Sequence, residues 1–199
     1  MSVSIIEICN SALFKLGAER ISSFSEDRKE AILCAEQYDK IRRKLLRGHP
    51  WNFAMKRVSL ARLPETPEFD FASQFALPQD VLRVIRVDDN KDFVIEGRLL
   101  LSDQDEMRIL YIADIQDTAK FDPTFAEVLA YKLAEDLAYP LVQSIGLKQE
   151  MARAATEELR DARSFDGQEG TQRMIQDDVF LNSRFGGDDF RGIDLDIQP

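Results

Sequence analysis

The chain has 199 residues and is 44% hydrophobic and 31% charged, a composition that suits one globular domain and argues against global disorder. No apolar run approaches the roughly 20 residues of a membrane-spanning helix, and the first residues lack the basic stretch of a secretory signal, so we expect no membrane partner. Two cysteines and one histidine exclude a disulfide scaffold and most zinc sites.

The formal net charge of −10 is spread very unevenly. Residues 40–62, the basic segment, contain eight basic residues and no acidic one, so they carry +8 and leave −18 for the rest of the chain. Residues 164–199 carry −5 and hold five of the nine glycines. An acidic total usually argues against a nucleic-acid partner, but this distribution makes the total a poor guide.

The first expected helix runs from about Ser4 to Leu16. Ser4 and Glu7 have the spacing of a capping box, in which each side chain bonds to the other's backbone N–H. Gly17 can supply the left-handed residue that ends a helix.

The second expected helix runs from about Asp27 to Arg47. Asp27 with Glu30 predicts a second capping pair, and Gly48 predicts the stop. Its apolar positions alternate by three and four residues, as in a helix packed against near-antiparallel neighbours.

Between about residues 51 and 120 the period changes to that of strands. Strand-like runs occupy residues 81–87, 93–95, 99–101 and 107–112. Glu96-Gly97-Arg98 predicts a tight hairpin turn between the middle two runs. Residues 60–78 contain three prolines and predict a long loop with a short edge strand.

The third expected helix begins with Asp122 as N-cap and Pro123 at the first helical position. It is apolar on most sides as far as Tyr139, so we expect several neighbours to bury it, within the chain or in other subunits. Pro140 should kink or end it. A fourth helix is expected from about Leu147 to Arg163.

These elements predict an α+β fold, mainly α, with a helical bundle of about four helices, an inserted antiparallel β-meander and an extended C-terminal arm. The expected division is an N-terminal helical pair (1–50), a β-rich insertion (51–120), a C-terminal helical pair of the same bundle (121–165) and an acidic, glycine-rich arm (166–199). Isolated apolar residues in the arm are typical of a segment that orders on a partner: Ile175, Phe180, Leu181, Phe185 and Phe190.

No catalytic constellation stands out, so we expect no enzyme, no cofactor and no metal site. His49 lies at the exit of the second helix, where a turn or cap role outweighs general-base chemistry. Cys9 and Cys34 fall on apolar helical stripes and are expected to be buried, inert thiols. Paired carboxylates such as Asp177-Asp178 could bind a hard cation, but a solvated tail is the better interpretation.

The basic segment is the main candidate interaction surface. Eight cations without one acid suit contact with phosphates or with an acidic protein surface. A solvated helix face, with cations favoured at the C-terminal end, explains the same pattern without binding. Trp51 and Phe53 within it are expected to be core contacts rather than a base-stacking platform. The candidate docking or DNA-contact residues are Lys40, Arg42, Arg43, Lys44, Arg47, Lys56, Arg57 and Arg62.

Several motifs occur in a recognisable order. An N-terminal helix ends in Leu16-Gly17-Ala18-Glu19, and an acidic loop and a basic helix lead to Arg47-Gly48-His49-Pro50-Trp51-Asn52-Phe53. Phe121-Asp122-Pro123-Thr124-Phe125 follows, with Leu133-Ala134. Over about residues 4–165 this order resembles the tail tubular protein A family, the head-to-tail adaptors of short-tailed, T7-like bacteriophages. The inserted His49-Pro50 departs from the family's Arg-Gly-Trp-x-Phe-like pattern.

The resemblance implies a structural virion protein, assembled in the host cytoplasm, with a helical bundle and a β-rich projection. Such adaptors form a ring, of twelve copies in known relatives, between the portal and the tail nozzle, with tail fibres as a further partner and genomic DNA passing through the channel. The apolar residues of the arm would then bind the portal. The basic segment would dock on protein first and touch DNA second, because each phosphate bound steepens the salt dependence by roughly 0.9 and tight binding would brake sliding DNA.

Two alternatives remain. A nucleic-acid-binding regulatory protein would use residues 40–62 and bind duplex DNA as an isolated chain. A tail-associated hydrolase would need a carboxylate pair, and no carboxylate lies in a recognisable glycine- or histidine-supported site.

Overall fold

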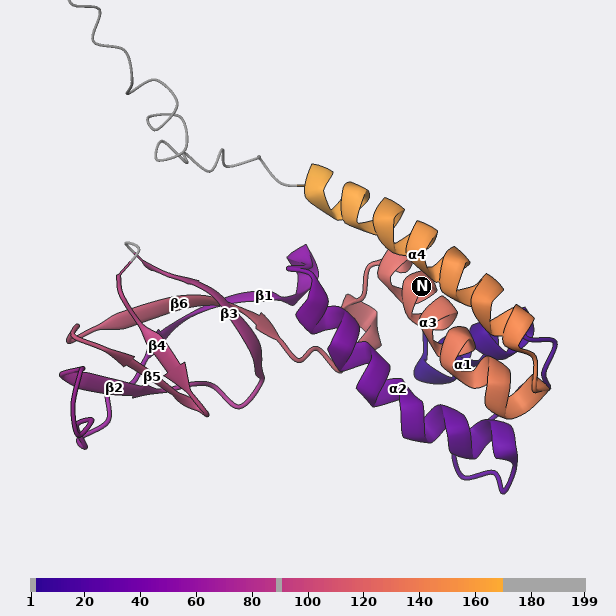
Figure 1. The fold of residues 1–199 in the computed structure, drawn as a ribbon, viewed down its shortest axis with the longest axis horizontal. Coiled ribbons are helices and arrows are strands. Elements are labelled where there is room, and N and C mark those ends of the chain that lie inside the picture. The colour runs from indigo at the N-terminus through magenta and orange to yellow at the C-terminus, as the bar shows by residue number, and fades with distance from the viewer. Residues whose placement is uncertain (1–2, 89–90, 170–199) are drawn as a thin grey trace, which may run out of the picture. The chain divides into compact units, whose positions relative to one another are not determined.

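The computed structural model describes residues 3–88 and 91–169 (Figure 1). Within them, four α-helices and two small antiparallel sheets confirm the predicted α+β class, mainly α. The helices are α1 (Ile5–Lys15), α2 (Lys29–Gly48), α3 (Pro123–Val142) and α4 (Ile145–Gln168), and short 3₁₀ helices occupy Asn52–Ala54 and Thr118–Lys120. The strands are β1 (Met55–Leu60), β2 (Ser73–Ala76), β3 (Val81–Val87), β4 (Val94–Glu96), β5 (Leu99–Ser102) and β6 (Met107–Ala113). The predicted arm residues Ile175, Phe180, Leu181, Phe185 and Phe190 lie outside the described residues.

The start and end of α1 follow the sequence prediction. The Glu7 N–H donates to Ser4 Oγ at 3.1 Å, and the Ser4 N–H donates to Glu7 Oε2 at 2.6 Å, which completes the capping box. Gly17 follows the helix with φ +66°, the left-handed conformation that costs glycine least.

The start of α2 differs from the predicted Asp27–Glu30 capping pair. Arg28 precedes the first helical residue, and no side chain caps the helix there. The carboxylate that does accept backbone hydrogen bonds is that of Glu26, which bonds to the Ser22 N–H at 2.6 Å. The acidic side chain therefore closes the turn before the helix instead of capping the helix itself.

The end of α2 is built around a buried tryptophan. Gly48, predicted as a left-handed stop, is the last helical residue, and the chain leaves in an extended conformation at His49 (φ −147°). Trp51 is fully buried, and its Nε1–H donates to the Leu45 carbonyl at 3.1 Å, which pairs one of the free carbonyls at the helix end. His49 thus has the predicted cap position and Trp51 the predicted core position.

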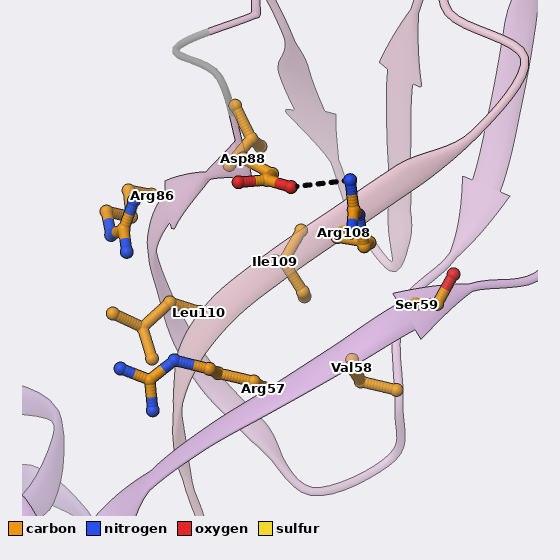
Figure 2. Close-up of a pocket in the computed structure, with 9 residues that line it drawn as sticks. Arg57, Val58, Ser59, Arg86, Asp88, Arg108, Ile109 and Leu110 are labelled. Carbon is orange, nitrogen blue, oxygen red and sulfur yellow. Dashed lines mark ion pairs between the residues drawn. The ribbon is translucent and has the colours of Figure 1, made fainter.

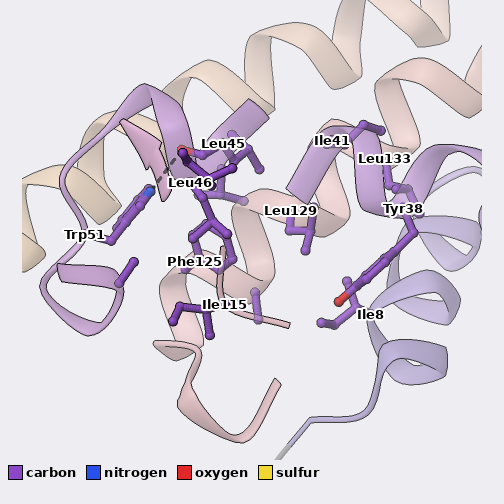
Figure 3. Close-up of a cluster of buried hydrophobic side chains, with 14 of the residues drawn as sticks. Ile8, Tyr38, Ile41, Leu45, Leu46, Trp51, Ile115, Phe125, Leu129 and Leu133 are labelled. Atoms are coloured by element: carbon purple, nitrogen blue, oxygen red, sulfur yellow. Dashed lines mark hydrogen bonds between the residues drawn. The ribbon is translucent and has the colours of Figure 1, made fainter. Parts of the chain in front are cut away.

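The helix α3 contacts α1, α2 and α4, so it is the centre of the bundle. Asp122 Oδ1 accepts from the Thr124 N–H at 2.7 Å and Pro123 is the first helical residue, as predicted. Its buried side chains meet those of the neighbouring helices (Figure 3). Pro140 does not end the helix, which continues for two more residues to a left-handed Gln143 (φ +55°).

The helix α4 is longer than predicted. It begins after Ser144, whose hydroxyl accepts a backbone N–H of the first turn at 3.1 Å, and it continues to Gln168, five residues past Arg163. Residues 166–168 are therefore helical and do not belong to an extended arm, which corrects the predicted boundary at 166.

The strands are antiparallel, as predicted, but their order is not that of a simple meander. One sheet has the order β1-β6-β3 and the other β2-β5-β4. β4 and β5 form the predicted hairpin, with Gly97 at φ +59° in its turn. β6 is the centre of the first sheet, paired with β1 on one side and β3 on the other, and the chain enters the second sheet between β1 and β3 and again between β3 and β6.

A continuous hydrophobic cluster joins the helices to the sheets. Ile112 of β6 is paired on both sides within the sheet and is buried, and Ile115, just beyond the end of β6, lies near Phe125 in the helical core (Figure 3). The segment that leaves α2 and the segment that follows β6 both pass through this buried region. The first sheet is held at the end of α2 there, through contacts of α2 with β3 and β6.

Candidate interaction surfaces

The structure places Arg42, one of the predicted contact residues, inside the protein. Its side chain is 2% exposed, and Nη1 donates to Asp114 Oδ1 at 2.5 Å and to the Ile115 carbonyl at 2.6 Å. Nη2 donates to Asp39 Oδ1 at 3.1 Å. The guanidinium ties α2 to the segment that follows β6, so Arg42 is a structural residue and its place among the contact residues is corrected.

Four more of the predicted contact residues are engaged within the chain. The contacts are Arg43 with Asp114 (3.4 Å), Lys56 with Asp80 (2.7 Å), Arg62 with Asp105 (2.5 Å) and Arg47 with the Leu82 carbonyl. In the described ranges, three members of the set are exposed and make neither an ion pair nor a side-chain hydrogen bond: Lys40, Lys44 and Arg57. The basic segment is therefore no single free surface.

Lys56 takes part in a small polar cluster between β1 and β6. Its Nζ lies 2.7 Å from Asp80 Oδ2, and the Tyr111 hydroxyl donates to Asp80 Oδ1 at 3.1 Å. Burial alone would raise the pKa of Asp80, but these two contacts outweigh it and lower the pKa below its ordinary value. Burial and the contact with Asp80 raise the pKa of Tyr111 to about 12. These groups stabilise the sheet.

A different basic surface forms on one face of the β1-β6-β3 sheet. Arg57 of β1 and Arg86 of β3 both lie opposite Leu110 of β6, and Arg108 lies two residues along β6, on the same face. All three arginines are exposed. Figure 2 shows Leu110 between Arg57 and Arg86. Arg57, Arg86 and Arg108 are called the arginine face below.

Arg86 reaches this face through an irregularity in β3. Arg83 lies opposite Ile112 and Arg86 opposite Leu110, although three residue steps separate the two arginines and only two separate their partners. The extra residue between Val84 and Arg86 is a β-bulge, which returns Arg86 to the face that Arg83 occupies. In a regular strand this spacing would place the two side chains on opposite faces.

A hollow of about 320 Å³ lies at the arginine face, lined by its three arginines and by Asp88, Leu110 and Val58 among others. Asp88 pairs with Arg108 at 2.9 Å (Figure 2). Among the described residues, neither Arg57 nor Arg86 has an ion pair, so the lining keeps a net charge of +2. Within the same part of the chain, no aromatic side chain lines it.

The two aromatic motifs of the sequence meet in one cluster. Trp51 and Phe53 follow α2, whereas Phe121 and Phe125 begin α3, some 70 residues later. The Phe125 ring centroid lies 5.1 Å from Trp51, 5.1 Å from Phe53 and 5.0 Å from Phe121, in edge-to-face arrangements. The cluster packs the exit of α2 and the start of the sheet against the start of α3.

The end of α4 is tied to the exit of α2 by Asp166. His49 Nε2 lies 3.1 Å from Asp166 Oδ2, the Asn52 N–H donates to Asp166 Oδ1 at 2.9 Å, and the Asn52 side chain donates to the Asp166 carbonyl at 2.6 Å. Burial lowers the pKa of His49 and outweighs the opposing effect of Asp166. The neutral imidazole therefore donates from Nε2, and the arrangement is a structural clasp.

The two cysteines are buried, as predicted. The hydrogen bond with Cys34 and burial raise the pKa of the Cys9 thiol, which stays protonated near neutral pH. Residues 3–88 and 91–169 contain no group of three or more histidine, cysteine or acidic side chains that could hold a metal ion. No helix in these ranges is long and apolar enough to cross a bilayer. The predicted carboxylate pair Asp177-Asp178 lies outside the described residues.

Neither the protein-family models nor the curated proteins include a match to this chain. The resemblance to the tail tubular protein A family therefore rests on the order of short motifs, two of which pack together in the aromatic cluster.

Sequence reasoning missed three residues that define these surfaces: Arg86, Arg108 and Asp114. Arg86 and Arg108 come from strands far from the basic segment, and only the sheet register brings them beside Arg57. A weak signal exists in Arg83-Val84-Ile85-Arg86, where two cations interrupt a β-branched run, but a regular strand gives them opposite faces. Asp114 has no local pattern that marks it as the partner of a buried arginine.

Proposed function

We propose that this chain is a structural virion protein, a ring-forming head-to-tail adaptor that links a phage portal to the tail nozzle and encloses part of the DNA channel. The observation that carries the proposal is the aromatic cluster. The two motifs on which the family resemblance depends, at residues 47–53 and 121–125, supply all four of its rings.

The cluster matters because it gives separate motifs one structural purpose. Residues 47–53 connect α2 to β1, and residues 121–125 connect the segment after β6 to α3. Packed together, they hold a β-rich region on a helical bundle, which is the architecture that the resemblance implies. Both segments flank the inserted β region, so they meet where that region joins the bundle, and the family motifs supply the rings that pack there.

The ring contacts are expected where apolar side chains remain exposed. Most of the apolar surface of α3 is buried by α1, α2 and α4 within the chain. Only its C-terminal end keeps exposed apolar side chains that could pack against another subunit. Tyr139 (54% exposed), Val142 (41%) and Ile145 (63%) cluster in the chain around the turn between α3 and α4. Exposed apolar groups gathered in this way favour protein contact.

The partners of the adaptor follow from the same proposal: further copies of the chain, a portal protein, a tail nozzle protein, and DNA in the channel. The regulatory alternative relied on residues 40–62 as one free basic surface. It loses that support, since Arg42 is buried and four other cations of the segment are engaged within the chain.

Electron microscopy of the purified chain, alone and with a portal from a T7-like phage, tests the proposal. We expect rings, or ring-shaped caps on portal assemblies. Ile145→Ser with Tyr139→Ser should prevent assembly and leave the fold intact. Phe69→Ser, which replaces a side chain that is 76% exposed in the β region, is the matched control and should assemble. A chain that remains a monomer beside assembled portal would refute the proposal.

A further inference from the structure

We propose that the arginine face binds the phosphodiester backbone of double-stranded DNA. The face combines Arg57, Arg86 and Arg108 from three strands around the half-buried Leu110. The inference deepens the proposed function and rests on it for the source of the DNA, but duplex binding is a property that the isolated chain either has or lacks.

Within the described residues, two of the three guanidinium groups on this face are unpaired. Arg57 and Arg86 are exposed and have no ion pair in the described part of the chain, whereas Arg108 has a single exposed partner, Asp88. Lys40 and Lys44 of α2 are also exposed and unpaired in this part of the chain, but Arg57 and Arg86 share one face of a sheet with a third arginine. Unpaired like charges gathered on one face repel each other, and an anionic partner would remove that cost.

All three cations are arginines, whose planar guanidinium offers two parallel donors to a phosphate or carboxylate. The bulge in β3 brings Arg86 to this face, and Arg83, half-buried beside it, extends the row of cations towards the end of α2. Arg83 and Arg163 also contribute to lowering the pKa of His49, so positive charge continues from the sheet to the clasp.

Among the described residues, the lining of the arginine face has no aromatic, methionine, asparagine or glutamine side chain. Protein interfaces are anchored by exposed aromatic or methionine side chains, and the hollow at the arginine face is lined by none. Single strands bind by stacking bases on aromatic rings, which are equally missing from that lining. The lining also holds no asparagine or glutamine, the usual readers of adenine, so any contact with bases would fall to the arginines, which read guanine. Backbone phosphates of a duplex remain as the partner that this chemistry fits best.

Weak binding suits a channel component. Three phosphate contacts give a salt slope of about −2.7, and affinity should fall about 40-fold between 50 and 200 mM salt. Each copy would therefore hold DNA only weakly as the salt concentration rises.

The test measures binding of the full chain to a fluorescein-labelled duplex of mixed sequence by fluorescence anisotropy, from 50 to 200 mM salt. The variant Arg57→Ala with Arg86→Ala should bind more weakly and lose only about 3.5-fold over the same range, since one contact remains. The matched control is Lys40→Ala with Lys44→Ala, which removes two exposed, unpaired cations from α2 and should behave as the natural chain.

Three results would overturn the inference. The first is no binding by the natural chain at 50 mM salt. The second is an equal loss in the Lys40 and Lys44 variant, which would mean that total charge matters and the arginine face does not. The third is displacement of the duplex by polyglutamate at equal charge concentration, which would assign the face to an acidic protein. None of these results contradicts the adaptor, which would still be seen as rings on a portal.

Discussion

Arginine occurs in two opposite settings in this protein, one in the bundle and one on the sheet. Arg42 of α2 is buried, with acceptors on Asp39, Asp114 and Ile115. Arg57 of β1, only fifteen positions later in the same basic segment, is exposed and shares its face with Arg86 and Arg108. A run of cations in a sequence therefore does not define a binding surface, because the fold decides which of them keep their charge free.

If buried and exposed arginines differ in this way, replacing Arg42 should lower the stability of the protein far more than replacing an exposed arginine. Arg42→Ala should lower the free energy of unfolding by about 3–5 kcal/mol, since it leaves the largely buried Asp114 carboxylate without its main partner. Arg43→Ala is the matched control, because Arg43 pairs with the same carboxylate but is 59% exposed, and it should cost about 0–1 kcal/mol. Urea denaturation measures both, and equal losses would show that burial is not what distinguishes the two.

Two aspartates of α4 also differ in burial, and replacing them should change the free energy of unfolding by smaller amounts. Asp166 is 10% exposed and accepts from His49 and Asn52, whereas Asp161, one turn earlier on α4, is 58% exposed. Asp166→Ala should cost about 1–3 kcal/mol, because it removes the carboxylate that accepts from the Asn52 N–H and from the half-buried His49 imidazole. Asp161→Ala should change stability by less than about 0.5 kcal/mol. An equal loss from Asp161→Ala would mean that the contacts of Asp166 with His49 and Asn52 are not what stabilises the end of α4.

Much of the fold could be predicted because its signals are local. The Ser4–Glu7 capping box, the Asp122-Pro123 helix start and the Gly97 turn each depend on a few neighbouring residues, and all three are present. The predicted cap of α2 was wrong for a local reason, since Glu26 bonds to the nearby Ser22 N–H, whereas the predicted end of α4 was wrong because of a distant contact. Asp166 bonds to the exit of α2 and extends α4 beyond its predicted end at Arg163.

The surfaces were less predictable, because they depend on strand register. The order β1-β6-β3 brings together residues from positions 57, 86 and 108, and a bulge determines on which face Arg86 lies. Neither feature follows from alternation of side chains along a single strand. The burial of Arg42 could not be predicted either, because its partner Asp114 lies 72 positions away in the sequence.

The clasp should also give stability a dependence on pH. Because the folded pKa of His49 is lowered by burial, its contribution is fully present above the unfolded pKa of about 6.5 and is lost as the pH falls through the folded value. Unfolding midpoints should therefore drop between pH 7.5 and 5.5, by less than Asp166→Ala removes. His49→Gln should flatten that change, and an unaltered slope in this variant would place the titrating group elsewhere.

The smallest expected effect belongs to the arginine face. Arg57→Ala with Arg86→Ala should change the free energy of unfolding by less than about 0.5 kcal/mol, since neither guanidinium has an ion pair in the described part of the chain. A loss above 1 kcal/mol would make these arginines structural, as Arg42 is. Duplex DNA sharpens the measurement, because a ligand that binds only the folded state raises the midpoint of unfolding. The midpoint of the natural chain should rise with added duplex at low salt and that of the variant should not, so the exposed arginines contribute to stability only when an anion is bound.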